Sequence, residues 1–224
     1  MNQISLTDET QQKQIFTVTK GLPYYLDWIS RQIQAGFSLD FSQGNQEIAQ
    51  LLLQGLTESQ KRLIQLAACC RWFDGGVING ILERLIPLNP PILGDLDNYS
   101  TVMQWLQNRD FVQYVQGKYR LDDVARDVFR GELWREDRQL FQQINQQLSQ
   151  YFQALADSEV FSDSPPRQCY ENEQWCDYIA EGLYYSFYGG KQESLGQLIC
   201  RFLESLYFSQ YEVSLLPEML NLAT

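Results

Sequence analysis

The chain has 224 residues, of which 44% are hydrophobic, and a formal net charge of −11. This length suits one or two domains with a real core, and the acidic balance argues against broad capture of nucleic acid or of an anionic membrane. No apolar run reaches the roughly 18–20 residues of a membrane helix. The N-terminus lacks the basic start and the apolar stretch of a signal peptide, so we expect a cytoplasmic protein.

The first block, residues 1–56, has the pattern of three helices and is expected to form a small helical domain. Thr7 is placed to cap the first helix, and Gly21 stands where that helix should stop. Pro23 suits the first position of a second helix, because its missing N–H has no partner there anyway. A third helix is expected after the polar stretch 38–46. The apolar face of the second helix comprises Tyr25, Leu26, Ile29 and Ile33.

The second block, residues 57–134, is expected to be a winged-helix domain. Thr57 and Gln60 have the spacing of a capping box, and Asp74 is placed to cap the next helix. After a third short helix, two β-prone runs flank Gly117, as a hairpin requires. Three helices followed by a hairpin is the winged-helix order. A helical bundle with an added hairpin is the alternative.

The third block, residues 135–224, is expected to be an α-helical tail. Its apolar stripe predicts one helix from about Leu140 to Leu155, followed by an exposed loop over Asp157–Gln168. Two amphipathic helices then flank a break at Gly189-Gly190. A helix, turn and helix of roughly 34 residues has the size of one tetratricopeptide unit. The fold class is therefore mainly α, and the tail is expected to be the first repeat of a helical array.

Two sets of side chains carry expectations about burial. Cys70 falls at helical spacing with apolar neighbours and is expected to be a small core residue. Because the last helix pair has more aromatic side chains than one buried face needs, we expect some of them to form a partner surface. The expected core residues include Tyr25, Ile29, Leu63, Leu66, Ile81 and Trp105. The expected surface residues are among Tyr184, Tyr185, Phe187 and Tyr188.

Catalytic and metal chemistry find little support in the sequence. The chain has no histidine, so Ser-His-Asp and Cys-His pairs are excluded. Zinc sites commonly combine histidine and cysteine ligands. This chain has no histidine, and its five cysteines include no Cys-x-x-Cys pair. Asp122-Asp123 is the most suggestive carboxylate pair, although Asp123 is also placed to cap the helix that follows. We therefore expect no catalytic residue and no metal site.

Nucleic-acid binding is an alternative function, because winged helices often bind DNA. The third helix of such a domain should then present several basic side chains to the duplex. Between Ser100 and Asp110 only Arg109 is basic, and the hairpin adds Lys118 and Arg120. Three basic side chains in an acidic chain provide too little positive charge for a DNA-binding surface. We expect an internal winged helix that packs against protein, with a DNA-binding regulator and a plain helical adaptor as alternatives.

The order of these parts resembles the signal-transducing NTPases of the AAA+ superfamily, the STAND class that includes NACHT and NB-ARC proteins. Gly21 and Pro23 match the family's Gly-x-Pro motif, which lies in a helical lid and contacts the bound nucleotide through its proline. Leu121, Asp122 and Asp123 match the Met-His-Asp motif, whose histidine approaches the β-phosphate. Asp122 replaces that histidine, and a carboxylate would repel a phosphate unless it were protonated or bridged by a cation.

The resemblance also implies what the chain should lack. No Gly-x-x-x-x-Gly-Lys-Ser/Thr loop occurs, and the family's phosphate loop and magnesium-binding strand would lie before Met1. We therefore expect an excised piece or an orphan C-terminal half, which is not itself an enzyme. ATP or ADP would bind only when an upstream P-loop core is joined to it. The expected partners are that core and a protein that binds the C-terminal helices.

Overall fold

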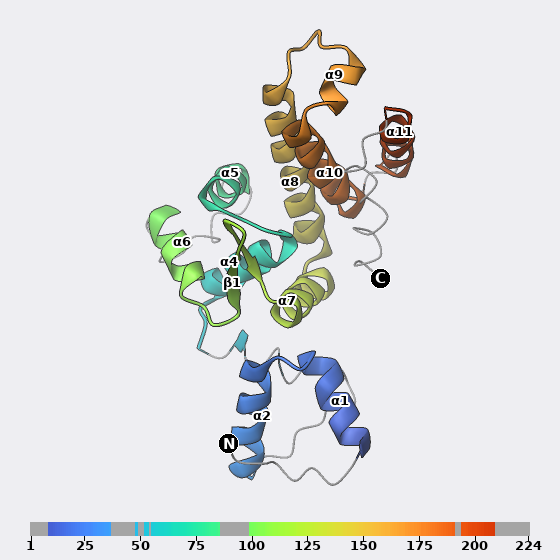
Figure 1. Ribbon diagram of the computed structural model, residues 1–224. Coiled ribbons are helices and arrows are strands. Elements are labelled where there is room, and N and C mark those ends of the chain that lie inside the picture. The colour runs from blue at the N-terminus through green and yellow to red at the C-terminus, as the bar shows by residue number, and fades with distance from the viewer. Residues whose placement is uncertain are drawn as a thin grey trace. The chain divides into compact units, whose positions relative to one another are not determined.

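The structure is a computed structural model, and it is mainly helical with one small antiparallel sheet of two strands (Figure 1). Among the helices that the structure describes, none is both long enough and apolar enough to cross a membrane. The described residues are 9–36, 48, 52–53, 55–85, 99–190 and 194–208.

The chain divides into two units. The first contains Met1–Ile78 and Pro90–Glu136, and the second contains Asn79–Asn89 and Asp137–Thr224. The last helix of the first unit is α7 (Asp123–Glu136). The residues of the expected lid and of the expected winged helix thus fall in the first unit, except for Asn79–Asn89, which belong to the second.

The first unit begins with α1 (Glu9–Thr19) and α2 (Pro23–Gln34), joined by a short turn. Pro23 lies in the first turn of α2, as predicted. Thr7 and most of the expected third helix lie outside the described residues. The buried side chains of this pair include Ile15, Val18, Tyr25 and Ile29.

The next two helices begin at the caps that the sequence predicts. Before α4 (Glu58–Cys69), the Thr57 hydroxyl accepts from the Gln60 N–H at 3.3 Å, and the Gln60 carboxamide accepts from the Thr57 N–H at 3.1 Å. Before α5 (Gly75–Leu85), the Asp74 carboxylate accepts from a backbone N–H of the first turn at 2.8 Å. Both caps satisfy donors that the helix itself leaves without partners.

A third helix and a hairpin follow, in the expected order. After α6 (Tyr99–Gln107), strands β1 (Val112–Val115) and β2 (Lys118–Leu121) pair in antiparallel register. Gln116 and Gly117 connect them with φ angles of 51° and 85°. Two successive positive φ angles are the geometry of a type I′ turn, whose twist matches that of paired strands.

The second unit contains α8 (Arg138–Glu159), α9 (Pro166–Tyr170), α10 (Glu173–Tyr188) and α11 (Ser194–Tyr207). The exposed loop expected over 157–168 is wrong at both ends. The preceding helix includes the first three residues of the expected loop, and α9 begins within that loop because a proline is well tolerated at a first helical position.

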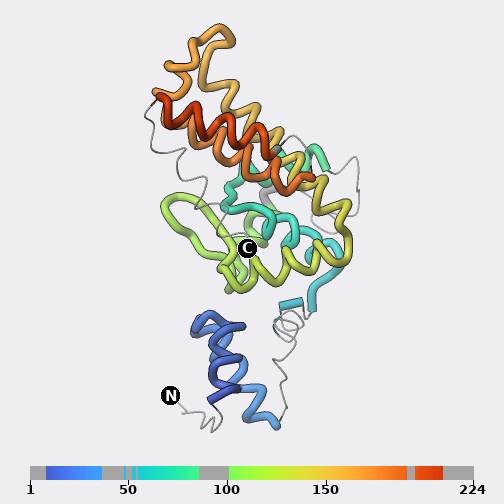
Figure 2. Tube along the Cα trace, turned by 90° about the vertical axis from the view of Figure 1, so that its right-hand side faces the viewer, coloured from blue at the N-terminus to red at the C-terminus, as the bar shows by residue number. Residues whose placement is uncertain are grey.

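Helices α8 and α10 lie side by side and run in opposite directions (Figures 1 and 2). The Ser149 hydroxyl donates to the carbonyl of Gly182 at 2.9 Å. The rings of Phe152 and Tyr185 stack with their centroids 5.5 Å apart and an interplanar angle of 14°. The core between these two helices therefore combines aromatic contacts with buried aliphatic side chains.

Most of the expected core is confirmed, and Cys70 is buried as predicted. Trp105 is only partly buried, and Arg109, which follows α6, lies over its ring with the guanidinium carbon 4.6 Å from the centroid. Of the α10 aromatics expected at a surface, Phe187 is 42% exposed, Tyr188 is partly buried, and the other two are buried. The buried core residues are Tyr25, Ile29, Leu63, Leu66 and Ile81.

Candidate functional site

The turn between α1 and α2 has a backbone shape that requires glycine. Lys20 and Gly21 have φ angles of 49° and 72°, in the left-handed region. The Gly21 N–H donates to the Thr19 hydroxyl at 3.2 Å, and the Leu22 N–H donates to the Thr19 carbonyl at 2.9 Å. A Cβ on Gly21 would lie 2.9 Å from the Phe16 ring, too close for an ordinary contact. Gly21 thus ends α1, as expected, and Pro23 is left exposed at the start of α2.

Asp122, and not Asp123, caps α7. Its Oδ1 accepts from the Ala125 N–H at 2.8 Å, whereas Asp123 is exposed as the first helical residue. The sequence-based assignment of the cap to Asp123 is wrong by one residue, because β2 ends at Leu121 and places Asp122 at the junction. Only a residue just outside the helix can turn its side chain back onto the free N–H groups of the first turn.

Asp122 also joins α7 to α2. The Tyr25 hydroxyl donates to both carboxylate oxygens, at 3.1 Å to Oδ1 and 3.0 Å to Oδ2. Asp122 is 6% exposed and Tyr25 is fully buried. A buried polar group without a hydrogen-bond partner lowers stability. The Tyr25 hydroxyl therefore gains an acceptor, and the Asp122 carboxyl group gains a donor.

Burial dominates the electrostatics of this pair. It raises the pKa of Asp122 above its ordinary value, although the N–H groups of Ala125 and Val124 and the Tyr25 hydroxyl act in the opposite direction. Burial, followed by the negative charge of Asp122, raises the pKa of the Tyr25 phenol far above its ordinary value. Tyr25 therefore remains a hydrogen-bond donor at any physiological pH.

Lys20 makes a second link between the turn and α7. Its ammonium group lies 2.6 Å from a carboxylate oxygen of Asp127 and 3.5 Å from the backbone carbonyl of Asp123. The two paired side chains are 45% and 55% exposed, so the ion pair is worth at most about 1 kcal/mol. It fixes the position of a cation beside the turn more than it stabilises the fold.

The structure thus brings together the two segments that contain all four candidate site residues. Gly21 and Pro23 lie on the turn that Lys20 connects to α7, and Asp122 and Asp123 lie at the start of α7. We call this region, Lys20 to Tyr25 with Asp122 to Asp127, the turn–cap junction. Tyr25 was predicted to be a core residue, but no partner was predicted for its hydroxyl. Because a buried tyrosine hydroxyl usually has a hydrogen-bond partner, its burial alone indicated that a polar residue should lie nearby.

The turn–cap junction contains a buried structural contact and has exposed residues on one side. Both oxygens of Asp122 already accept hydrogen bonds, so its carboxyl group is directed inward. Lys20 and Pro23 lie on the exposed side. Within the described residues, no group of His, Cys, Asp or Glu side chains could hold a metal ion.

The stability difference between the natural chain and Asp122→Asn is expected to depend on pH. Asparagine keeps an accepting oxygen but does not titrate. Because the folded pKa of Asp122 lies above its ordinary 3.8, its favourable contribution is complete below that pH and is lost as pH rises through the folded pKa. Urea unfolding of both proteins at several pH values should show the natural chain losing stability relative to the variant above pH 3.8. A constant difference, or one of opposite sign, would contradict this.

Comparison of the chain with protein-family models, with curated proteins and with solved structures finds no match.

Proposed function

We propose that the chain is the regulatory, nucleotide-clamping and interaction portion of a STAND-type signal-transducing ATPase, whose P-loop core would be supplied upstream. The observation that carries the proposal is the hydrogen bond between Tyr25 and Asp122, which are 97 residues apart. It holds the Gly-x-Pro segment against the segment that resembles Met-His-Asp. In the family that the chain resembles, both motifs reach the same nucleotide, so the two segments have to lie together in a functional member.

Under this proposal α1 and α2 form the helical lid, and α4 to β2 form a winged helix. The order of three helices and a hairpin supports this assignment. Phe73, between α4 and α5, exchanges backbone hydrogen bonds of 2.7 and 2.9 Å with Tyr119 of β2. This bridge ties the hairpin to the helices, as a wing requires, and it is less easily explained by a hairpin that merely decorates a bundle.

Asp122 would not contact phosphate in this arrangement, because its carboxyl group is buried and directed toward Tyr25 and α7. Lys20 is an exposed cation on the same turn as Pro23. An ammonium group is a suitable partner for a phosphate, and its present partner Asp127 is exposed and exchangeable. We therefore propose that Lys20 takes over the charge-sensing role of the replaced histidine.

The C-terminal helices are proposed to bind a protein partner, through α11 and not through α10. Four apolar side chains on α11 are about half exposed or more. Spacings of four, four and three residues place them on one face of the helix. A continuous apolar stripe on a helix is typical of a surface that a following repeat or a partner covers. The residues and their exposed fractions are Leu195, 54%, Ile199, 48%, Leu203, 57%, and Leu206, 52%.

The alternatives receive less support. A DNA-binding regulator would need its cations free, but Lys118 lies over the Trp72 ring at 3.6 Å, and Arg109 lies over the ring of Trp105 at 4.6 Å. A plain helical adaptor would use the α11 stripe equally well but gives no role to the turn–cap junction. Nucleotide binding therefore separates the adaptor from the STAND portion. The proposed location remains the cytoplasm.

Titration of the chain with ADP and ATP, followed by backbone NMR and by phosphate release, tests the proposal. One wall of a site offers few contacts, so binding is expected to be weak, with a dissociation constant of about 1 mM or above. No turnover is expected, because phosphoryl transfer needs a phosphate cradle and a held magnesium ion. Shift changes should centre on Lys20–Tyr25 and Asp122–Asp127.

Two lysine variants provide the matched comparison. Lys20→Met should remove the response to ADP, whereas Lys13→Met, which affects an exposed ion pair on α1, should leave it unchanged. Shift changes confined to other parts of the chain would contradict the site. Micromolar binding or magnesium-dependent turnover would contradict the assignment of catalysis to a separate core.

A further inference from the structure

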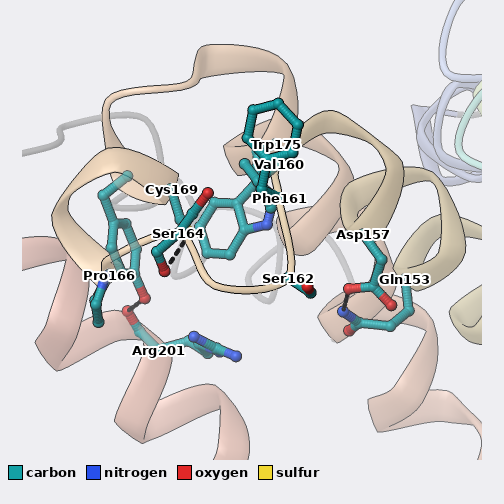
Figure 3. Close-up of a pocket in the computed structure, with 11 residues that line it drawn as sticks. Gln153, Asp157, Val160, Phe161, Ser162, Ser164, Pro166, Cys169, Trp175 and Arg201 are labelled. Carbon is teal, nitrogen blue, oxygen red and sulfur yellow. Dashed lines mark hydrogen bonds between the residues drawn. The ribbon is translucent and has the colours of Figure 1, made fainter.

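A pocket of about 500 Å³ lies within the second unit (Figure 3). It is formed by the last turns of α8, the following loop, α9, the first turn of α10, and α11. Its volume falls in the usual range for small-molecule sites, roughly 300–1,000 Å³. The lining side chains used below are Asp157, Phe161, Ser162, Tyr170, Trp175 and Arg201.

One wall of the pocket is held rigidly. The rings of Tyr170 and Trp175 meet edge to face with their centroids 5.1 Å apart, and both residues are buried. Glu204 accepts hydrogen bonds from the Tyr170 hydroxyl at 2.7 Å and from Arg201 Nη1 at 3.1 Å. The Arg201 guanidinium carbon lies 5.8 Å from the Trp175 ring centroid. The guanidinium is therefore positioned from two sides, and in Figure 3 it points into the open space.

The same wall includes a second hydrogen-bond donor. Trp175 lines the pocket, and its indole N–H makes no hydrogen bond to any residue in the described part of the chain. This N–H is therefore available to a ligand in the pocket. The indole N–H and the Arg201 nitrogens that Glu204 does not engage are donors on one wall of the pocket. A ligand carboxylate would accept hydrogen bonds from both and match the fork of the guanidinium.

The opposite wall carries a negative charge. Asp157 is exposed and accepts from the Gln153 carboxamide at 3.0 Å, and no lysine or arginine within the described ranges pairs with it. Figure 3 shows Gln153 and Asp157 on the side of the pocket away from Arg201. The Phe161 ring, 83% exposed, adds an apolar surface. The two walls thus offer opposite charges to one small ligand.

We infer that the pocket binds an α-amino acid with an apolar side chain. The ligand carboxylate would bind Arg201 and the indole N–H of Trp175, its ammonium group would bind Asp157, and its side chain would cover Phe161. Phosphorylated ligands fit less well, because Glu204 already offsets part of the charge of Arg201 and Asp157 repels a dianion. This inference does not depend on the proposed STAND function.

Isothermal titration of the full chain with three related compounds tests the inference. L-phenylalanine carries both charges, 3-phenylpropionate lacks the ammonium group, and 2-phenylethylamine lacks the carboxylate. L-phenylalanine is expected to bind saturably. Each analogue should bind at least about tenfold more weakly, because losing one charge-assisted contact leaves its protein partner unpaired.

Two pairs of variants locate the site. Arg201→Gln and Asp157→Asn should each weaken L-phenylalanine binding at least about tenfold. Arg109→Gln, which also removes an arginine from a tryptophan ring, and Asp177→Asn, an exposed aspartate of α10, should leave it within about twofold. Thermal unfolding reports whether each variant folds. Asp157→Asn alone keeps the inference testable if Arg201→Gln is unstable, because Asp157 is exposed.

Three results would overturn the inference. The first is the absence of saturable L-phenylalanine binding up to its solubility limit. The second is binding of 3-phenylpropionate as tight as that of L-phenylalanine, which would indicate a plain carboxylate site. The third is an equal loss of binding in the control variants and in the pocket variants.

Discussion

Leu66→Ala is expected to lower the free energy of unfolding by about 2–5 kcal/mol, the usual range for a fully buried leucine. Leu66 is completely buried in α4, which packs against α7 and β2 in the first unit. The loss combines the transfer of the removed methyl groups to water with the cavity that remains. Equilibrium unfolding in urea, followed by circular dichroism and tryptophan fluorescence, measures it.

Leu203→Ala is the matched control. It makes the same change on an exposed face of α11, where the side chain is 57% exposed, so the loss should stay below about 0.5 kcal/mol. A loss of that small size for Leu66→Ala would mean that the α4 stripe faces water, and the assignment of this core would fail.

Asp122→Ala is expected to lower the free energy of unfolding by about 2–4 kcal/mol, because it removes two interactions at once. The helix cap contributes about 0.5–2 kcal/mol. The Tyr25 hydroxyl, left buried without its acceptor, costs about 1–3 kcal/mol more. The effect should therefore exceed that of an ordinary exposed cap substitution.

A double-mutant cycle with Tyr25→Phe separates the two contributions. If Tyr25 and Asp122 interact as the structure shows, the double variant should be less destabilised than the sum of the single variants, by about 0.5 kcal/mol or more. Tyr114→Phe, at a 64% exposed tyrosine of β1, should change stability by less than about 0.5 kcal/mol and show no coupling to Asp122. Additive effects of Tyr25→Phe and Asp122→Ala would remove the central contact of the turn–cap junction.

The features that could be predicted from the sequence are those fixed by local hydrogen bonds or by local backbone angles. The Thr57–Gln60 box and the Asp74 cap satisfy backbone groups three residues away, whereas Pro23 and Gly117 supply the backbone angles of a helix start and of a tight turn. Such contacts depend on residue type and spacing alone. The apolar stripes of α4 and α8 were equally readable, because periodicity reports a buried face.

The features that could not be predicted depend on contacts between distant residues. Residue spacing could not predict the hydrogen bond between Tyr25 and Asp122, because the two side chains meet only after α2 has packed against the start of α7. The one-residue error at Asp123 has the same origin, because the end of β2 is set by pairing with β1. Some of the α10 aromatics were expected at a surface, and Phe187 is exposed, but the sequence could not show that packing buries Tyr184 and Tyr185.

For the candidate site, the sequence located both segments and the structure places them together. The sequence did not identify Lys20 as a site residue, because its position depends on a left-handed turn that no motif specifies. Nucleotide contact by Pro23 remains a prediction, which the ADP titration addresses.

The discontinuity of the second unit has a consequence for the order in which the chain is made. Asn79–Asn89 leaves the ribosome long before Asp137, so an early piece of the second unit must wait while the rest of the first unit is synthesised. During that interval Gly80 and Arg84 lack Tyr151, over which they pack in the finished protein. A fragment beginning at Asp137 would permanently lack this lining. The natural cut for dissecting the protein therefore does not fall between α7 and α8, and limited proteolysis should find no stable C-terminal fragment that starts there.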